Sequence, residues 1–189
     1  MAASATERRA FALVAPSGSG KSTAAWFLRE AFEASGLRVA VLKLAEPLYR
    51  LQREFYRCAG REIDLYAQDQ PLLEAIAAYL RTLSPRALVD DLLRRLDASD
   101  ADVVINDDLR DPHVDWPALR GAGFRVVSVV VDERVRRERL ARRRDLATAT
   151  DSRASRGIGS IPVDIVLENN GSLRELEAAV AAVVRRELR

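Results

Sequence analysis

A loop of small residues, Ala15-Pro-Ser-Gly-Ser-Gly-Lys-Ser22, lies between a short apolar run and a stretch with helical periodicity. Small residues let successive backbone N–H groups turn inward toward an anion, and the N-terminus of the following helix adds partial positive charge. The lysine would reach the terminal phosphates of a nucleoside triphosphate, and the next serine hydroxyl would bind Mg²⁺. Alanine stands at position 15, where this motif usually has glycine, and it is the smallest replacement. The predicted nucleotide contacts are Pro16, Ser17, Gly18, Ser19, Gly20, Lys21, Ser22 and Thr23.

Two adjacent acidic residues, Asp107 and Asp108, follow a second apolar run that ends at Asn106. In open α/β sheets, ligands bind outside the carboxyl ends of the strands, where the phosphate loop also lies. An aspartate at that edge can bind Mg²⁺ or accept a proton from an attacking oxygen. Because neighbouring residues of a strand point to opposite faces, at most one of the pair would face the phosphates. The sequence leaves open which one does so, and a polar turn without a chemical role is the alternative.

The segment from 134 to 144 contains seven arginines, and Arg136, Arg139 and Arg143 fall on one helical face. Guanidinium groups match phosphate oxygens in a bidentate way and keep their charge near neutral pH. A Ser/Gly-rich stretch follows this segment. We therefore expect a lid over residues 134–160 that closes on ATP phosphates. A solvated surface helix is the alternative.

Short apolar runs at 11–15, 38–44, 102–106, 124–131 and 163–167 alternate with helical stretches. Helices are expected from 46 to 97, with breaks near Gly60, Pro71 and Ser84–Pro85, and a last helix with a capping box at Ser172. This alternation favours the α/β class, with a mostly parallel sheet covered on both faces. The chain has 189 residues, of which 48% are hydrophobic, so residues 1–189 are expected to form one domain.

The charge and composition of the chain argue against several kinds of site and function. Lys and Arg total 30 against 28 Asp and Glu, with Lys21 and Lys43 as the only lysines, and the two signs are interspersed. A general nucleic-acid-binding surface is therefore not indicated. One cysteine and one histidine leave no disulfide and no Cys-rich zinc site. The N-terminus carries no apolar leader, and no apolar run approaches the ~18 residues of a membrane span, so we expect a cytoplasmic protein without a membrane partner.

Three motifs resemble the signatures of small P-loop kinases, a group that includes nucleoside monophosphate kinases and dephospho-coenzyme A kinase. They are the loop 15–23, the spacing Arg136-x-x-Arg139-Leu140-x-x-Arg143 and the segment 164–173. Within this group, segments 104–110 and 44–48 are similar to the phage-type deoxynucleoside monophosphate kinases. Those enzymes carry an Asp-x-Arg strand end and an apolar-Ala-x-Pro-Leu segment after the second strand. The resemblance covers the chain from Phe11 to the final helix.

This resemblance implies a P-loop NTPase fold with a five-stranded parallel sheet, an acceptor-binding helical region at 46–97 and an arginine-bearing lid. It also implies ATP and Mg²⁺ as cofactors. The implied catalytic residues are Lys21, Asp108, Arg110, Arg139 and Arg143. Ser22 would bind the metal with Asp107 or Asp108. Asn169, Gly171 and Arg139 would lie against the bound nucleotide.

The acceptor would be chosen by the helical region together with the Asp-x-Arg arginine. The expected contacts are Glu46, Arg50, Arg53, Tyr56, Arg81 and Arg110. Arg50, Arg53 and Arg57 recur at helical spacing and could hold a 5′-phosphate, although ordinary surface exposure explains each of them equally well. Tyr49 and Tyr56 could flank a base or simply pack. Trp26 is expected in the core, and His113 is assigned no role.

These expectations point to transfer of the γ-phosphoryl group of ATP to a nucleoside or deoxynucleoside monophosphate. A second interpretation keeps ATP and changes the acceptor to a hydroxyl, as in dephospho-coenzyme A, a nucleoside, a sugar or an antibiotic, with an aspartate or Glu46 as base. A third is a nucleotide-binding regulatory NTPase. A small-molecule acceptor is the expected partner, and a homodimer is compatible with the sequence.

Overall fold

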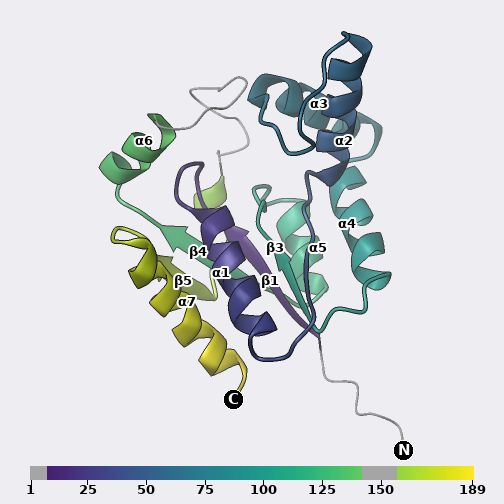
Figure 1. The fold of residues 1–189 in the computed structure, drawn as a ribbon. Helices are drawn as coiled ribbons and strands as arrows, with labels where there is room; N and C mark the ends of the chain where they lie inside the picture. Colours follow the sequence, from purple (N-terminus) through teal and green to yellow (C-terminus); the bar gives the residue numbers. More distant parts are fainter. Residues whose placement is uncertain (1–7, 142–156) are drawn as a thin grey trace, which may run out of the picture.

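The computed structural model describes residues 8–141 and 157–189. Its centre is a sheet of five parallel strands in the order β2-β3-β1-β4-β5 (Figure 1). The strands are β1 (Arg9–Val14), β2 (Val39–Val41), β3 (Val103–Asn106), β4 (Phe124–Val130) and β5 (Ile165–Glu168). The predicted parallel α/β fold is therefore confirmed. Strand β2 is shorter than the apolar run 38–44 suggested, because the chain after Val41 turns toward the helical region.

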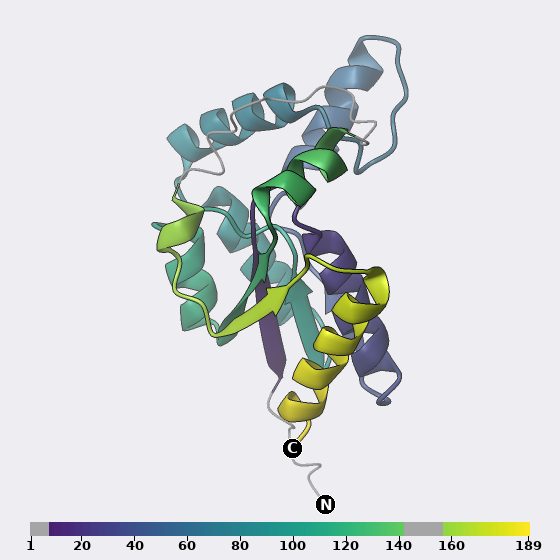
Figure 2. The ribbon, with the colours of Figure 1, turned by 90° about the vertical axis from the view of Figure 1, so that its left-hand side faces the viewer.

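Helices cover both faces of the sheet, as expected for buried parallel strands. On one face lie α1 (Lys21–Glu33) and α7 (Leu173–Glu187), and on the other lie α4 (Ala87–Asp97) and α5 (Asp115–Gly121) (Figures 1 and 2). Helices α2 (Glu46–Cys58) and α3 (Gln70–Leu83) form the upper part of Figure 1, and α6 (Glu133–Ala141) follows β4. The breaks near Gly60 and Ser84–Pro85 are confirmed, whereas Pro71 lies in the first turn of α3 and no helix separates it from Gly60. Helix α5 was not predicted.

Successive side chains along β3 pack on opposite faces of the sheet. Val103 and Ile105 pack with α1, whereas Val104 packs with α4. All three are completely buried, which is why the strand reads as a continuous apolar run. Strand β3 ends at Asn106, and if the alternation continued past it, Asp107 would follow the α1 side and Asp108 the opposite side. That these two aspartates face opposite sides of the sheet stays a prediction.

The helical region between β2 and β3 has its own small core. Leu48, Tyr49, Leu73, Ile76 and Leu88 are buried together and join α2, α3 and the start of α4. This cluster is separate from the two apolar layers against the sheet. Helices α2 and α3 therefore pack around a small core of their own.

Two local predictions had opposite outcomes. The capping box before α7 is confirmed: the Ser172 side chain accepts from the Glu175 amide, and the Glu175 carboxylate accepts from the Ser172 amide. The expectation that Trp26 is a core residue is wrong, because its side chain lies on the outer face of α1 and is 53% exposed. Phe27, its neighbour, takes the inward position. None of the described helices is long and apolar enough to span a bilayer.

Candidate functional site

The phosphate loop depends on two glycines with left-handed backbone geometry. Gly18 has φ 85° and Gly20 has φ 92°, a region that other residues enter only with strain. A Cβ atom on Gly18 would lie 2.7 Å from Leu140 Cγ, and one on Gly20 would lie 2.3 Å from Asn169 Nδ2. Both neighbours come from segments more than a hundred residues away. The loop therefore needs glycine for its backbone conformation and for close contact with other elements.

Buried polar groups at the loop fit a bound anion. The Ser19 hydroxyl is buried and has no hydrogen-bond partner among the described residues. Lys21 begins α1, is largely buried, and donates from Nζ to the Ala15 carbonyl. Ser22, one residue further, is exposed. Because a buried hydroxyl without a partner is costly, an anion that accepts its hydrogen bond would be stabilised here.

Asn169, at the end of β5, is tied to the loop. Its side-chain Nδ2 donates to the Ser19 carbonyl at 2.8 Å, and its Oδ1 accepts from Arg139 Nη2 at 3.5 Å. The other terminal nitrogen of Arg139, Nη1, is buried without a partner among the described residues. It would lie 3.9 Å from a Cβ on Gly20. An unpartnered guanidinium nitrogen at this point is available to a phosphate oxygen.

Helix α6 is docked on the same loop. Arg136 Nη1 donates to the Ser17 carbonyl at 3.1 Å, while its Nε and Nη2 bind Glu133. Hydrogen bonds from Arg136 and Arg137 lower the pKa of Glu133 to about 2. Arg143 and residues 142–156 of the predicted lid lie outside the described residues. Gly171 lies beside the Glu175 carboxylate at the start of α7.

Asp107 pairs with Lys43 at the ends of two neighbouring strands. The register pairs Val39 with Val103 and Val41 with Ile105, so continuing it sets position 43 beside position 107. Lys43 Nζ lies 2.5 and 2.7 Å from the two carboxylate oxygens of Asp107, which is 6% exposed. Burial disfavours the charge on Lys43, but the charge and hydrogen bonds of Asp107 act against this and leave the pKa of Lys43 raised.

Asp108 binds the chain where the helical region begins. Its carboxylate accepts from the amides of Leu44 and Ala45 at 2.8 and 2.9 Å, directly before α2. Asn106 Nδ2 donates a third hydrogen bond at 2.6 Å. Burial, together with the negative charge of Asp107, raises the pKa of Asp108, while the two amides and Lys43 oppose that rise. Asp108 thus ties the backbone just before α2 to the segment that follows β3.

The donor set around Asp107 suits magnesium bound together with phosphate. Continuing the alternation of β3 would set Asp107 on the side of the sheet that carries α1, whose second residue is Ser22. Mg²⁺ in nucleotide sites takes one or two protein oxygens, phosphate oxygens and water. Within residues 8–141 and 157–189, no group of three or more His, Cys, Asp or Glu forms a metal site. The residues therefore fit a metal that is shared with a nucleotide.

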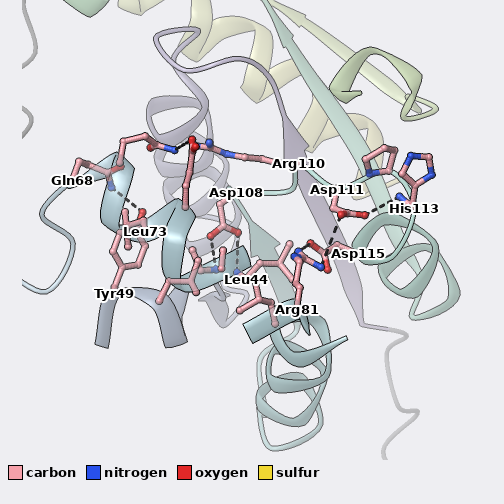
Figure 3. Close-up of a pocket in the computed structure, with 17 residues that line it drawn as sticks. Leu44, Tyr49, Gln68, Leu73, Arg81, Asp108, Arg110, Asp111, His113 and Asp115 are labelled. Carbon is pink, nitrogen blue, oxygen red and sulfur yellow. Dashed lines mark hydrogen bonds and ion pairs between the residues drawn. The ribbon is translucent and has the colours of Figure 1, made fainter. Parts of the chain in front are cut away.

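A pocket of about 280 Å³ lies between α2, α3 and the segment after β3 (Figure 3). It has an apolar part and a polar part. The apolar lining is Leu44, Ala45, Leu48, Leu73, Ala77, Leu88 and Pro112. The polar lining is Tyr49, Gln68, Gln70, Glu74, Arg81, Asp108, Arg110, Asp111, His113 and Asp115. Such a mixed lining is typical of a site for a small organic molecule.

The two pocket arginines differ in their pairing. Arg81 Nη2 lies 2.6 Å from Asp115 Oδ2, and Arg81 Nη1 lies 3.9 Å from Asp111 Oδ2. Burial raises the pKa of Asp115 although Arg81 lowers it, whereas amide hydrogen bonds, against the effect of burial, leave the pKa of Asp111 lowered. Arg110 has no ion-pair or hydrogen-bond partner among the described residues and borders the same pocket. It is therefore available to an anionic group of a ligand.

The structure divides the predicted acceptor contacts into two sets. Arg81, Arg110 and Asp108 line the pocket. Four others, Glu46, Arg50, Arg53 and Tyr56, do not. Glu46 binds Arg50 at 3.2 Å and Tyr66 at 2.8 Å, Tyr56 donates to Asp69 at 2.8 Å, and Arg53 is exposed.

Tyr49, which was expected to flank a base or to pack, lines the pocket together with Gln68. The lining residues that were not predicted are Gln70, Glu74, Asp111, His113 and Asp115. The signal that could have indicated the last three is the Asp111-Pro112 turn directly after the Asp-x-Arg segment. Asp111 accepts from the amides of His113 and Val114 at 2.8 and 2.7 Å and so starts α5.

Comparison with solved structures identifies the fold. No protein-family model and no curated protein matches the chain. Shikimate kinase from Aquifex aeolicus is 16% identical, with a TM-score of 0.51 over 95% of this chain and 98% of that one. Shikimate kinase from Acinetobacter baumannii, solved with shikimate, is 16% identical, with a TM-score of 0.55 over 97% and 94%. A protein proposed to be a kinase, from Chloroflexus aurantiacus, is 13% identical, with a TM-score of 0.56 over 96% and 99%. The chain has the α/β fold of P-loop kinases.

Proposed function

We propose that this protein transfers the γ-phosphoryl group of ATP to a small acceptor bound in the pocket of Figure 3, and that the acceptor is a nucleoside or deoxynucleoside monophosphate. The observation that carries the proposal is the position of two adjacent residues just after β3. Asp108 lines the pocket, and Asp107, by continuation of the strand alternation, would fall on the side of the sheet that carries α1. The proposed donor and acceptor sites would therefore meet at the end of β3.

On the donor side, Lys21 and the loop amides would bind the β- and γ-phosphates. The buried Ser19 hydroxyl and Arg139 Nη1 offer two further hydrogen bonds to phosphate oxygens. Ser22 and Asp107 would hold the magnesium ion, which supplies charge neutralisation during transfer. Arg143 and Gly171 keep their proposed roles in the lid and beside the nucleotide.

On the acceptor side, the pocket matches the parts of a nucleotide. Arg110, which has no partner among the described residues, would bind the acceptor phosphate. Gln68 and Gln70 offer amide groups to a base edge, and Gln68 already donates to the Tyr49 hydroxyl at 2.8 Å. Leu48 and Leu73 form an apolar floor. A phosphate acceptor is ionised at neutral pH and needs no general base, which agrees with the engagement of Asp108 by backbone amides.

A hydroxyl acceptor is the second candidate, and one observation favours it. Burial and Asp107 raise the pKa of Asp108, which would make it a better proton acceptor at neutral pH. In addition, two of the solved structures that share the fold are shikimate kinases. Under this candidate, Asp108 would have to release one of its amide hydrogen bonds to act as the base.

An acceptor screen tests the proposal. Purified protein with MgATP is given a panel of nucleoside monophosphates and a panel of small hydroxyl compounds, and mass spectrometry identifies the metabolite that gains one phosphoryl group. We expect a monophosphate to be converted into its diphosphate. Conversion of a hydroxyl compound instead would establish the second candidate. ADP formation that no acceptor accelerates would contradict both and favour a regulatory NTPase.

Two substitutions sharpen the assignment. Arg110→Ala should raise the acceptor KM at least about tenfold and leave the ATP KM unchanged, because it removes a charge-assisted hydrogen bond only on the acceptor side. Arg94→Ala is the matched control, since Arg94 is exposed on α4 and pairs with Asp91. Asp108→Asn should lower kcat by less than about tenfold with a phosphate acceptor, whereas a loss of 10² or more would indicate a general base.

A further inference from the structure

We propose that Lys43 is an internal counter-ion of the metal site: it occupies Asp107 in the nucleotide-free protein and keeps free divalent cations away from that carboxylate. This inference rests on the proposed function, because the metal concerned is the one that accompanies ATP. Lys43 is a positioning residue in this role, acting through Asp107.

The contact geometry is the first support. Lys43 Nζ lies within 2.7 Å of both oxygens of Asp107, so its ammonium group contacts both carboxylate oxygens at once. Both groups are shielded from solvent, with side-chain exposures of 22% and 5%. Two cations on one buried carboxylate repel each other strongly because the local dielectric is low. A metal ion can therefore take Asp107 only if Lys43 gives it up.

The surroundings of Lys43 supply a second support. Tyr66 places its ring 5.6 Å from Nζ, which gives the ammonium group a further favourable neighbour besides Asp107. Asp108, the adjacent carboxylate, is already bound by the Leu44 and Ala45 amides and by Asn106. Of the two adjacent carboxylates, Asp107 is bound by a flexible lysine side chain, whereas Asp108 is bound by backbone amides. Lys43 can exchange its position, whereas the partners of Asp108 cannot.

The choice of residue type is a third, independent support. The chain has only two lysines among 30 basic residues, and the other one is Lys21 of the phosphate loop. Arginine would bind the same carboxylate as a rigid bidentate fork, whereas lysine is a compact charge on a flexible stem. A chain that uses arginine almost everywhere has lysine in the predicted phosphate loop and against the predicted metal-binding carboxylate. This pattern fits a cation that must move.

The direct experiment measures metal binding without nucleotide. Mn²⁺ is titrated into the protein, and the free ion is followed by electron paramagnetic resonance. Wild type should bind Mn²⁺ weakly, and Lys43→Met should bind it at least about tenfold more tightly, since the competing charge is gone. Lys43→Arg keeps a cation at Asp107 and should bind as weakly as wild type. The double variant Lys43→Met with Asp107→Asn should lose the gain, because the carboxylate is removed.

Equal Mn²⁺ affinity in wild type and Lys43→Met would overturn the proposal and leave Lys43 a purely structural partner of Asp107. If Lys43→Met does not fold, Lys43→Gln, which can still donate a hydrogen bond to Asp107, replaces it with the same expectation. Thermal melting with and without MgCl2 gives a second readout: Mg²⁺ alone should raise the Tm of the Met or Gln variant more than that of wild type. Calorimetry with MgATP on wild type reports on nucleotide binding separately, so failure of the proposed function is distinguishable from failure of this exchange.

Discussion

Asp108 ties the chain just before α2 to the segment after β3, and its removal should cost more stability than an ordinary surface substitution. In Asp108→Ala, the amides of Leu44 and Ala45 lose their acceptor, and Leu44 is only 3% exposed. A hydrogen bond to a charged group contributes about 1.5–3 kcal/mol, so the two amides together account for about 3–6 kcal/mol. The carboxylate is itself buried beside Asp107, and losing that repulsion offsets part of the cost. We expect a net loss of about 2–4 kcal/mol in the free energy of unfolding.

Urea unfolding at fixed pH measures this loss. Asp108→Asn keeps one acceptor oxygen and should lose about 1–2 kcal/mol. Asp100→Ala is the control, because Asp100 is exposed and its ion pair with Arg38 lies on the surface. It should change stability by no more than about 0.5 kcal/mol.

The pH dependence has a definite sign. Burial raises the pKa of Asp108, so between this folded pKa and the ordinary value of 3.8 the folded protein holds a proton that the unfolded chain has released. The stability that Asp108 provides should therefore increase as the pH falls through the folded pKa toward 3.8, and the gap between wild type and Asp108→Ala should widen over that range. A gap that narrows on acidification would refute the burial argument. A loss below about 1 kcal/mol in Asp108→Ala would refute the argument that its hydrogen bonds to the Leu44 and Ala45 amides stabilise the fold.

Three further predictions concern backbone geometry, loop packing and helix capping. Gly20→Ala should weaken MgATP binding in calorimetry at least about tenfold, because its Cβ would lie 2.3 Å from Asn169 Nδ2. Gly36→Ala is the control: Gly36 has a similar φ of 80° but open space around it, so this variant should bind MgATP normally. Asn169→Ala should lower the free energy of unfolding by about 1–3 kcal/mol, since the Ser19 carbonyl loses a buried donor, and nucleotide affinity should fall with it; unchanged values for both would show that the contact is incidental. Ser172→Ala should cost about 0.5–2 kcal/mol in urea unfolding through loss of the α7 cap without a change in kcat, and an altered kcat would mean that the cap also serves the site.

The parts of the fold that follow from local chemistry could be predicted from the sequence. The phosphate loop, the alternation of apolar runs with helices and the Ser172 capping box each depend on residues close together in the chain. The opposite orientation predicted for Asp107 and Asp108 rests on the two-residue period of a strand. Which aspartate meets the phosphate loop depends on the helix that each face carries, and no local pattern contains that information.

The acceptor pocket was less accessible to prediction for a related reason. Helical spacing places Arg50 and Arg53 on a common face, but it does not say whether that face meets a ligand or solvent. Arg50 instead pairs with Glu46, and Arg53 is exposed. The prediction that Trp26 is a core residue was wrong for a similar reason: a large aromatic residue is often buried, but Trp26 is exposed. The place of Asp115 in the pocket was not predicted because it begins α5, a helix of 7 residues that is too short to show a clear hydrophobic period.

The contact between Lys43 and Asp107 also bears on how the sheet assembles. Strand β2 has only three residues and lies at the edge of the sheet, so its apolar side chains specify its alignment with β3 weakly. A slip of one residue would turn Lys43 toward the apolar layer that holds Ala40 and Leu42, and it would leave Asp107 without its cation. The ion pair thus disfavours misaligned pairing. The two side chains that we propose to control metal binding therefore also favour the correct alignment of β2 with β3.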